Sequence, residues 1–251
     1  MQSFIGWIGG KRALRKDILA MFPQNYSRYI EVFGGAGWVL FGKTYSAGQL
    51  EVFNDADGSL INIYRCIKYH PDALAAELSG LPQSREIFFD WQNQICQRGY
   101  TDIQRAARSL YLVKESFGSD RRTFATAPRI SENISASFSE VQKRLRKVII
   151  ENLDFERLIR IYDRQDALFY CDPPYIGTEK YYQEAFSAQD HERLAKVLHG
   201  IKGKFLLSYN DCPLARELYK DCTIQSLTRE NLLAGPMRGE FKEILIRNYE
   251  V

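Results

Sequence analysis

The sequence predicts an α/β fold in which a doubly wound, mostly parallel sheet carries helices on both faces. Short apolar runs recur along the chain, amphipathic helical patterns separate them, and one long stretch without strands interrupts the alternation. Runs that are apolar on both faces are typical of strands buried in a parallel sheet. We therefore expect one large domain with an inserted helical segment.

The predicted strands are rich in Val, Ile, Phe and Tyr, which favour buried strands. In chain order they are residues 29–33, 50–53, 148–152, 167–171, 204–208 and 243–247. Apolar residues at helical spacing predict helices between them, at residues 11–21, 190–198 and 213–219. Because strands and helices alternate, neighbouring strands are expected to run parallel.

Residues 67–147 form the predicted insertion, between two segments of the sheet domain at 1–66 and 148–251. The insertion interleaves basic and aromatic side chains, a combination that suits phosphates and bases. A solvated helical subdomain with an aromatic core would explain the same composition. Residues 116–140 are rich in Ser, Thr, Gly and Arg and predict a long loop or hairpin.

Composition is that of an ordinary folded protein. Of the 251 residues, 45% are hydrophobic and 26% are charged, which argues against a disordered, coiled-coil or fibrous protein. The N-terminus, MQSFIGWIGGKR, lacks the continuous apolar segment of a secretion signal, and apolar runs elsewhere are short. We therefore expect a soluble cytoplasmic protein without a membrane segment.

The cysteines are scattered and form no metal-binding pattern. There are five cysteines without a CxxC pair, and three histidines accompany them. This pattern predicts reduced thiols and no metal site. The net charge of +3 is too mild to indicate a nucleic-acid partner by itself.

Residues 30–41, IEVFGGAGWVLF, run from a strand through glycines into a helical pattern. Glycines at such a junction permit a tight turn and a close approach of the backbone to a ligand, and the helix N-terminus can receive one. The spacing is not GxGxxG, so simple packing of strand on helix would also explain the glycines.

Asn54 and Asp55 end the next strand, about 20 residues after the glycines. A carboxylate at this point suits the two hydroxyl groups of a ribose. An ordinary helix cap would explain the same residues. Because both features meet at one edge of the sheet, together they favour a nucleoside ligand.

The fourth strand ends in Asp172, Pro173, Pro174 and Tyr175. Proline supplies no ladder N–H and fixes its own φ, so the strand must stop at the edge where ligands bind in open α/β sheets. The rigid turn would hold the Asp172 carboxylate and the Pro173 carbonyl as two acceptors for an amino group, while Tyr175 offers a ring for stacking a base. A plain proline turn gives no reason for the acid and the ring.

The order of three features along the chain resembles the Dam-like DNA adenine methyltransferases of the D12 type: FGGAG, then a long insertion, then DPPY. This order is their alpha arrangement. The segments GWIGGKR, FLLSYND and EFKEILIRNY are also similar to family segments, so the resemblance covers most of the chain outside the insertion. It implies a seven-stranded Rossmann-like methyltransferase sheet and a target-recognition role for residues 67–147. It further implies S-adenosylmethionine as the methyl donor, double-stranded DNA as the substrate and a prokaryotic or phage-type origin.

The resemblance also implies roles for individual residues. Trp7 and Lys11 would contact the methionyl end or the adenine of the cofactor, and Asp55 its ribose. Residues 172–175 would form the catalytic segment. The full set of expected cofactor contacts is Trp7, Lys11, Phe33, Gly34, Gly35, Ala36, Gly37, Asp55, Asp154, Phe155 and Asp172, with Asp154 and Phe155 at the adenine.

Elementary chemistry supports these implied roles. An aromatic amine is a poor nucleophile because its lone pair is delocalised into the ring, so acceptors that favour a tetrahedral nitrogen assist its attack. Asp172 and the Pro173 carbonyl would supply them. The methyl donor already carries a positive charge and needs no metal. Because the amine is paired inside a duplex, the base must first turn out of the stack, and Tyr175 would stack on it.

The insertion departs from the family members that read GATC, which carry a segment resembling FNGLCRYN. The corresponding stretch here, LYLVKESFGSDRRTFATAP, has residues 119–122 in place of the asparagine-rich core, so a GATC target is not implied. We expect Arg121 or Arg122 to contribute to target recognition or phosphate contact. Lys114 and Arg129 are further candidates for DNA contacts.

The sequence leaves three functions open. The first is DNA adenine-N6 methylation. The second keeps the fold but methylates cytosine N4 or adenine in RNA, because DPPY indicates an amine on a planar ring rather than one base. The third is a catalytically silent nucleic-acid binder. Related glutamine-methylating enzymes carry Asn in place of Asp172, which disfavours a protein substrate. A cognate restriction endonuclease and action as a monomer on DNA are further expectations.

Overall fold

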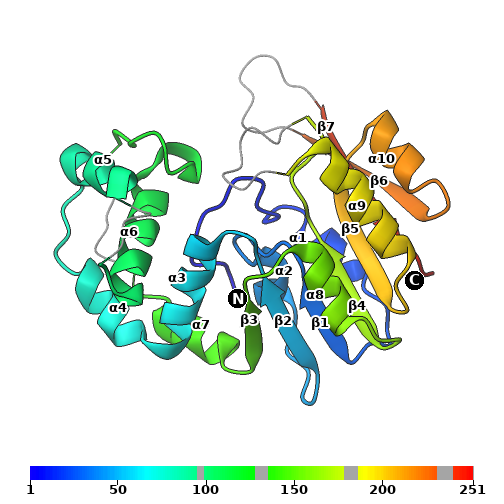
Figure 1. Cartoon of the computed structure of the whole chain (residues 1–251), viewed down its shortest axis with the longest axis horizontal. Coiled ribbons are helices and arrows are strands. Elements are labelled where there is room, and N and C mark those ends of the chain that lie inside the picture. Colours follow the sequence, from blue (N-terminus) through cyan, green and yellow to red (C-terminus); the bar gives the residue numbers. More distant parts are fainter. Residues whose placement is uncertain (95–98, 128–134, 178–185, 231–239, 251) are drawn as a thin grey trace.

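The computed structural model describes residues 1–94, 99–127, 135–177, 186–230 and 240–250. A seven-stranded sheet with helices on both faces forms the larger part of the molecule (Figure 1). The strand order is β3-β2-β1-β4-β5-β7-β6, in which β1 to β5 are parallel and β7 pairs antiparallel with both β5 and β6. The predicted seven-stranded, mostly parallel α/β sheet is confirmed.

The strands agree closely with the sequence prediction. They are β1 (Arg28–Glu31), β2 (Leu50–Asn54), β3 (Val148–Glu151), β4 (Ala167–Cys171), β5 (Lys204–Asn210), β6 (Thr223–Glu230) and β7 (Glu240–Arg247). The helices of the sheet domain are α1 (Arg15–Ala20), α2 (Trp38–Gly42), α3 (Gly58–Tyr69), α8 (Phe155–Tyr162), α9 (Ala188–His199) and α10 (Pro213–Leu218). Those of the insertion are α4 (Pro71–Leu78), α5 (Arg85–Gln94), α6 (Asp102–Glu115), the 3₁₀ turn η1 (Phe117–Ser119) and α7 (Phe138–Leu145).

Both faces of the sheet are buried because successive residues of each strand point to opposite sides. In β4, Leu168 and Tyr170 belong to one hydrophobic core, and Phe169 and Cys171 belong to the other. The first core is covered by α1, α2, α3 and α7, and the second by α8, α9 and α10. Strands that are apolar on both faces are therefore required, as the sequence predicted.

Connections run from β1 outward to β2 and β3 on one side, and then from β4 to β5 on the other. The direction of winding reverses between β1 and β4, which are hydrogen-bonded neighbours with Glu31 opposite Tyr170. In open α/β sheets a crevice forms outside the carboxyl ends of the strands at such a point. The glycine turn that follows β1 and the DPPY segment that follows β4 flank this crevice.

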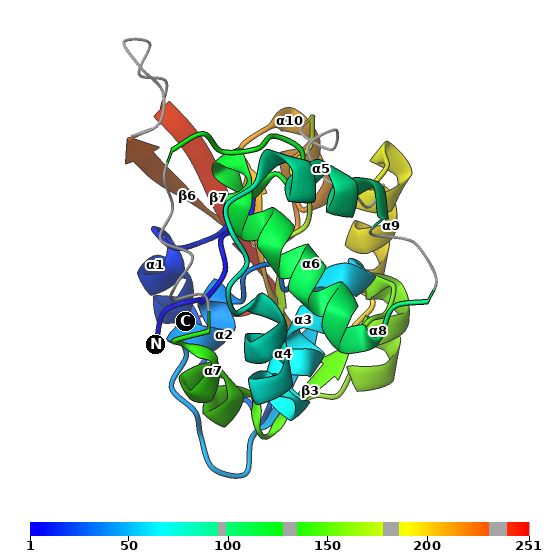
Figure 2. The ribbon, with the colours of Figure 1, turned by 90° about the vertical axis from the view of Figure 1, so that its left-hand side faces the viewer.

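The described part of the predicted insertion is helical (Figure 2). It has a small core of its own, in which Phe88, Tyr111 and Leu112 are buried. However, α4, α7 and part of α6 pack into the core beside α3, and Arg144 of α7 binds Glu51 of β2 at 2.6 and 2.9 Å. Residues 67–147 therefore share a core with the sheet, and the division at 67 and 147 stays a prediction.

Three elements differ from expectation. Helix α1 begins at Arg15 rather than at residue 11: residues 12–14 form a turn before it, and Lys11 lies at the crevice, where it contacts Asp172. Strand β3 is less buried than predicted because it forms the edge of the sheet, and Ile149 is 38% exposed. Strand β6 was not located because its sequence, TIQSLTRE, is largely polar, as is common at a sheet edge.

Candidate active site

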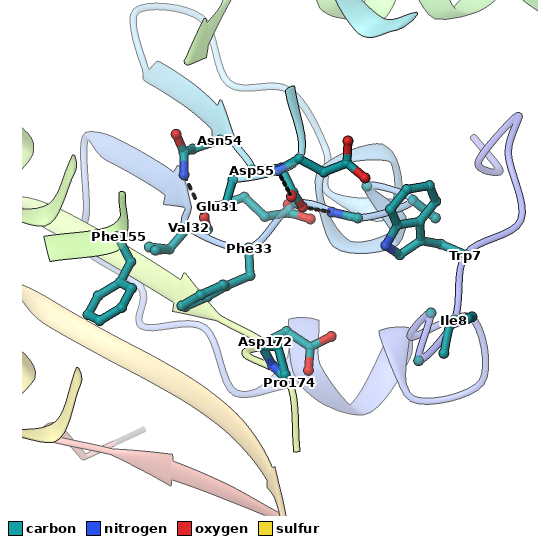
Figure 3. Close-up of a pocket in the computed structure, with 18 of the residues that line it drawn as sticks. Trp7, Ile8, Glu31, Val32, Phe33, Asn54, Asp55, Phe155, Asp172 and Pro174 are labelled. Carbon is teal, nitrogen blue, oxygen red and sulfur yellow. Dashed lines mark hydrogen bonds between the residues drawn. The ribbon is translucent and has the colours of Figure 1, made fainter. Parts of the chain in front are cut away.

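A cleft lies at the carboxyl ends of β1, β2 and β4, where the winding of the sheet reverses. It encloses about 1260 Å³ of empty space, part of which is open to solvent. Residues 7–11, the glycine turn, the starts of α3 and α8, and the DPPY segment line its walls (Figure 3).

The glycine turn is held at its close approach to β2. The Gly34 N–H donates to Asn54 O at 2.7 Å, and a Cβ at Gly34 would lie 2.3 Å from the Phe53 ring. Gly35 and Gly37 have φ of +50° and +66°, the left-handed region that favours glycine. This turn therefore needs glycine both for its backbone conformation and for lack of space. Its residues 34–37 line the cleft.

Asp55 and Asp57 connect the glycine turn to α3. Asp55 accepts the N–H of Gly35 at 2.8 Å and that of Asp57 at 2.9 Å, and burial raises its pKa to about 6. Asp57 caps α3 by accepting the N–H groups of Ser59 and Leu60. The Asp55 carboxylate thus has a structural role at the cleft, and each oxygen keeps a second lone pair for a ligand.

One end of the cleft is aromatic. Phe33 and Phe155 have ring centroids 5.8 Å apart, and Phe186 lies at 5.8 Å from each of them. Arg193 stacks on Phe155 at 4.1 Å and is bound by Asp154, which also caps α8. Figure 3 shows Phe33 and Phe155 toward one side of the cleft and Trp7 toward the opposite side. Flat apolar surfaces of this kind suit an aromatic base.

Asp172 lies on the wall between β4 and β5. The register places Cys171 opposite Leu207, so Asp172 is beside Ser208, whose hydroxyl donates to Asp172 Oδ1 at 2.8 Å. Lys11 Nζ lies 2.8 Å from the same oxygen. Burial raises the pKa of Asp172 above its ordinary value, and the bonds from Lys11 and Ser208 oppose that rise. The carboxylate is 16% exposed, so it is accessible from the cleft.

The remainder of the DPPY segment is anchored to β5 and β7. Tyr175 is buried and its hydroxyl donates to Glu243 Oε2 at 2.5 Å, while Lys11 lies 4.5 Å from the centre of its ring. Ile176 exchanges two backbone hydrogen bonds with the Asn210 side-chain amide. These contacts make the segment a rigid support for Asp172.

The insertion contributes one wall of the cleft through the loop after η1. Arg121 is buried there, with Nη1 at 2.8 Å from Asp57 Oδ2 and its guanidinium 4.6 Å from the centre of the Trp7 ring. Its neighbour Arg122 is exposed. The sequence assigned both arginines to DNA contacts and gave no reason to distinguish them.

Most of the predicted site residues meet at the cleft. The lining includes Trp7, Lys11, Phe33 to Gly37, Asp55, Asp154, Phe155, Asp172 and Pro174. Pro173 is buried between two lining residues, Asp172 and Pro174, and Tyr175 is buried next to Pro174. Lys114 lies elsewhere, where its Nζ donates to Phe4 O at 2.6 Å, and Arg129 is outside the described residues.

Sequence reasoning missed several residues of the site. Ser208, Glu243 and Glu31 lie within the strands, where only the sheet register reveals their neighbours. Glu31 is buried, Tyr29 donates to it at 2.6 Å, and burial raises its pKa to about 8. The signal available was a charged residue in an otherwise apolar strand, as at Glu31 in YIEVF.

Within the described residues, no group of three or more His, Cys, Asp or Glu side chains could hold a metal ion. The cysteines described, at positions 66, 171, 212 and 222, are free thiols. No helix in the same part of the chain is long and apolar enough to cross a membrane.

The sheet is doubly wound and seven-stranded, and a glycine turn and a DPPY segment share one cleft, which is consistent with a Rossmann-like methyltransferase fold. The family model for the D12 class N6 adenine-specific DNA methyltransferase matches residues 7–232, and the chain belongs to this family. The family resemblance seen in the sequence is confirmed. The chain is therefore an adenine-specific DNA methyltransferase, a class of enzyme that uses S-adenosylmethionine.

Individual relatives agree with the family match. The Type II methyltransferase M1.LlaDCHI of Lactococcus lactis subsp. cremoris is 31% identical over 279 residues, covering 99% of this chain and 96% of the relative. The DNA adenine methylase of Vibrio cholerae is 25% identical, with coverage of 97% and 95%. The Retron Ec67 DNA adenine methylase of Escherichia coli is 24% identical, with coverage of 96% and 88%. Of the acceptors that DPPY leaves open, adenine in DNA is the one that these matches favour.

Proposed function

We propose that the cleft binds S-adenosylmethionine, and that Asp172 directs the N6 amine of a flipped adenine toward the methyl group. The observation that carries this proposal is the position of Asp172. Its carboxylate projects from a rigid turn into the same cleft that the glycine turn and the aromatic end line. A methyl donor and an amine acceptor must meet at one point, and this cleft has a binding surface for each.

The lining fits the cofactor in its chemistry. Phe33 and Phe155 offer ring faces for the adenine, and Asp55 lies at the end of β2, where its free lone pairs suit ribose hydroxyls. The turn at Gly34 leaves no room for a side chain, so its backbone can approach a ligand. When bound, S-adenosylmethionine supplies an electrophilic methyl group on a positively charged sulfur.

Asp172 would act on the target nitrogen. Within the described residues, Lys11 and Ser208 both bind Oδ1 of the carboxylate, which leaves Oδ2 to accept an N–H of the amine. The Pro173 carbonyl would accept the second N–H. Two acceptors oriented in this way favour a tetrahedral nitrogen, whose lone pair is available for attack. Lys11 keeps Asp172 oriented and, by its charge, opposes protonation of the carboxylate.

Tyr175 would stack on the flipped base, although its ring is buried and its hydroxyl is bound by Glu243. Duplex DNA would lie along the insertion, where Phe117 is 71% exposed beside the loop that carries Arg121. An exposed aromatic residue at such a tip can enter the base stack. Arg122, Lys114 and Arg129 stay candidates for DNA contacts.

The biological setting is also a proposal. The name of the Lactococcus relative, a Type II methyltransferase, supports a cognate restriction endonuclease as a partner. The bacterial sources of the relatives support a prokaryotic or phage-type origin and action in the cytoplasm. We propose that the protein acts as a monomer on DNA, because one chain carries both the cleft and the insertion.

A direct experiment tests the reaction. The protein is incubated with cofactor carrying a labelled methyl group and with duplex DNA, and the digested nucleosides are identified. We expect N6-methyladenine, and single-molecule sequencing of DNA from an expressing host should map it to one site. Label in N4-methylcytosine, label in RNA but not in DNA, or no transfer to any nucleic acid would contradict the proposal.

A further inference from the structure

Arg121 enters the cleft from the insertion with its backbone held in an uncommon conformation. Its φ is +59°, in the left-handed region that residues with side chains rarely adopt. Its N–H donates to Ser116 Oγ at 3.0 Å, and its carbonyl accepts from Gln92 Nε2 at 2.7 Å. Two parts of the insertion therefore hold the backbone so that the side chain reaches the start of α3.

The guanidinium of Arg121 is shielded from solvent, but its ion pair with Asp57 does not use all of its N–H donors. The side chain is 7% exposed, and Nη1 contacts Asp57 Oδ2 at 2.8 Å. The other oxygen of Asp57 already accepts the N–H groups of Ser59 and Leu60. A guanidinium has five N–H donors in a planar fork, so the ion pair through Nη1 leaves donors for a second carboxylate.

Three basic side chains line the cleft in the described residues, and their partners differ. Arg193 lies at the aromatic end and is bound by Asp154 and Asp190. Lys11 is bound to Asp172 at 2.8 Å, with Glu243 at 3.9 Å. Arg121 lies over Trp7, which Figure 3 shows on the side opposite Phe155.

We propose that Arg121 binds the carboxylate of the amino-acid end of the methyl donor. This inference rests on the proposed cofactor site: with the adenine against the aromatic end of the cleft, the amino-acid end extends past the glycine turn toward Trp7. Arginine is well suited to a carboxylate because its parallel N–H groups match the two oxygens. The insertion, and not only the sheet domain, then contributes to cofactor affinity.

A DNA phosphate is the alternative partner for this arginine. To reach a duplex outside the cleft, Arg121 would have to leave Asp57, whose buried carboxylate would lose its ion-pair partner. Removing one partner from a buried ion pair is strongly unfavourable because it leaves the other charge buried and uncompensated. A ligand that enters the cleft can instead bind Arg121 where it lies. Burial therefore favours the cofactor over the DNA.

The test measures binding by calorimetry without DNA, and uses two ligands that differ only in the carboxylate: S-adenosylmethionine and its decarboxylated analogue. We expect the wild-type protein to bind S-adenosylmethionine roughly 10- to 100-fold more tightly, the range for hydrogen bonds to a charged group. In Arg121→Gln this ratio should fall to about 1 to 3, with the affinity for the analogue little changed. Arg122→Ala should keep the wild-type ratio.

Each outcome decides the proposal. An unchanged ratio in Arg121→Gln, or a wild-type ratio near 1, would overturn it. If Arg121→Gln is too unstable to measure, the double variant Arg121→Gln/Asp57→Asn removes both charges of the pair and takes its place under the same criterion. Phe155→Leu should weaken both ligands equally. If Phe155→Leu weakens neither, the cofactor site itself is misplaced, which is a different failure from a misassigned Arg121.

Discussion

The two walls of the cleft are constructed in different ways. The sheet wall, with Asp172 and the glycine turn, is fixed by strand register and by backbone hydrogen bonds to neighbouring strands. The insertion wall comes from the loop at residues 119–121, from which Arg121 projects with its backbone in a left-handed conformation. Rigid strands hold the residues that must be placed most accurately, whereas a loop can vary in sequence without disturbing them.

This difference suggests a division of roles. The sheet wall would supply the chemistry common to the class, whereas the insertion wall would add a selective contact to the cofactor through Arg121. Substitutions on the sheet wall should therefore change turnover or all cofactor binding. Substitutions in the loop should change the affinity for one ligand and leave the affinity for another unchanged. Variants of both walls test this division.

The largest effect is expected at Asp172. Asp172→Asn keeps the shape of the side chain but replaces an anionic acceptor with an amide, so we expect kcat to fall by about 10²- to 10³-fold. The dissociation constant of the cofactor should change little, because the change removes an interaction with the amine. Steady-state kinetics on duplex DNA, with calorimetry for the cofactor, separates the two quantities.

Glu217→Gln is the matched control for Asp172→Asn, because that carboxylate is 71% exposed on α10. It should behave as wild type. A rate for Asp172→Asn near that of the wild-type enzyme would show that the acceptor lies elsewhere and would remove the main argument for the sheet wall. Asp172→Ala should be slower still.

The sequence predicted the sheet wall well, for physical reasons. Apolar runs determine which segments are buried strands, and β4 has the predicted bounds, Ala167–Cys171. Residues that follow parallel strands lie at the same edge of the sheet, whatever the details of packing. Asp172 and the glycine turn therefore line the same cleft. The sequence did not reveal Ser208 or Glu243, because their contacts depend on register between strands far apart in the chain.

The insertion wall was beyond prediction from sequence. Arg121 and Arg122 are adjacent arginines in a polar loop, and periodicity carries no information on which one points inward. The choice depends on the left-handed backbone of Arg121 and on the Asp57 carboxylate, which is distant in sequence. The helical nature of the segment was predictable, whereas its sharing of a core with the sheet through α7 was not.

The next largest effect is expected at the aromatic end. Phe155→Leu keeps an apolar side chain but removes the ring face, and stacking of a base on an aromatic residue contributes about 1–3 kcal/mol. The dissociation constants of S-adenosylmethionine and of 5′-methylthioadenosine, which lacks the amino-acid end, should both rise by roughly 5- to 100-fold. Calorimetry measures both. Arg121→Gln is the contrasting variant, and should spare methylthioadenosine. If Arg121→Gln also weakened both ligands equally, the two ends of the cleft would not bind different parts of the cofactor.

A different kind of effect concerns the pH dependence of the free energy of unfolding. Burial raises the pKa of Glu31 to about 8, from an ordinary value near 4.5, so the folded protein retains a proton that the unfolded chain releases between these values. The free energy of unfolding should therefore decrease as pH rises from about 4.5 to about 8, by on the order of 1 kcal/mol per pH unit from this group.

Glu31→Gln, a neutral side chain of the same shape, should flatten this part of the pH profile. Urea midpoints at several pH values measure it, and Glu217→Gln should retain the wild-type slope. Asp55 and Asp172, whose pKa values are also raised by burial, contribute in the same direction and remain in both variants. A slope that Glu31→Gln leaves unaltered would mean that Glu31 is ionised in the folded protein.

The smallest effect is expected at Arg122, the outward neighbour of Arg121. Its side chain is exposed, while its N–H donates to Asp120 Oδ1 at 2.8 Å, so Arg122→Ala should leave the loop folded. Loss of one phosphate contact should weaken binding to all duplexes a few-fold and reduce the slope of log affinity against log salt concentration by about 0.9. Fluorescence anisotropy over a salt series measures this slope, with Arg160→Ala on α8 as an exposed control. Loss confined to one target sequence would mean that Arg122 reads a base edge, while an unchanged slope would exclude the phosphate contact. In either case, unchanged cofactor affinity in Arg122→Ala would separate the outward arginine of this loop from the inward one.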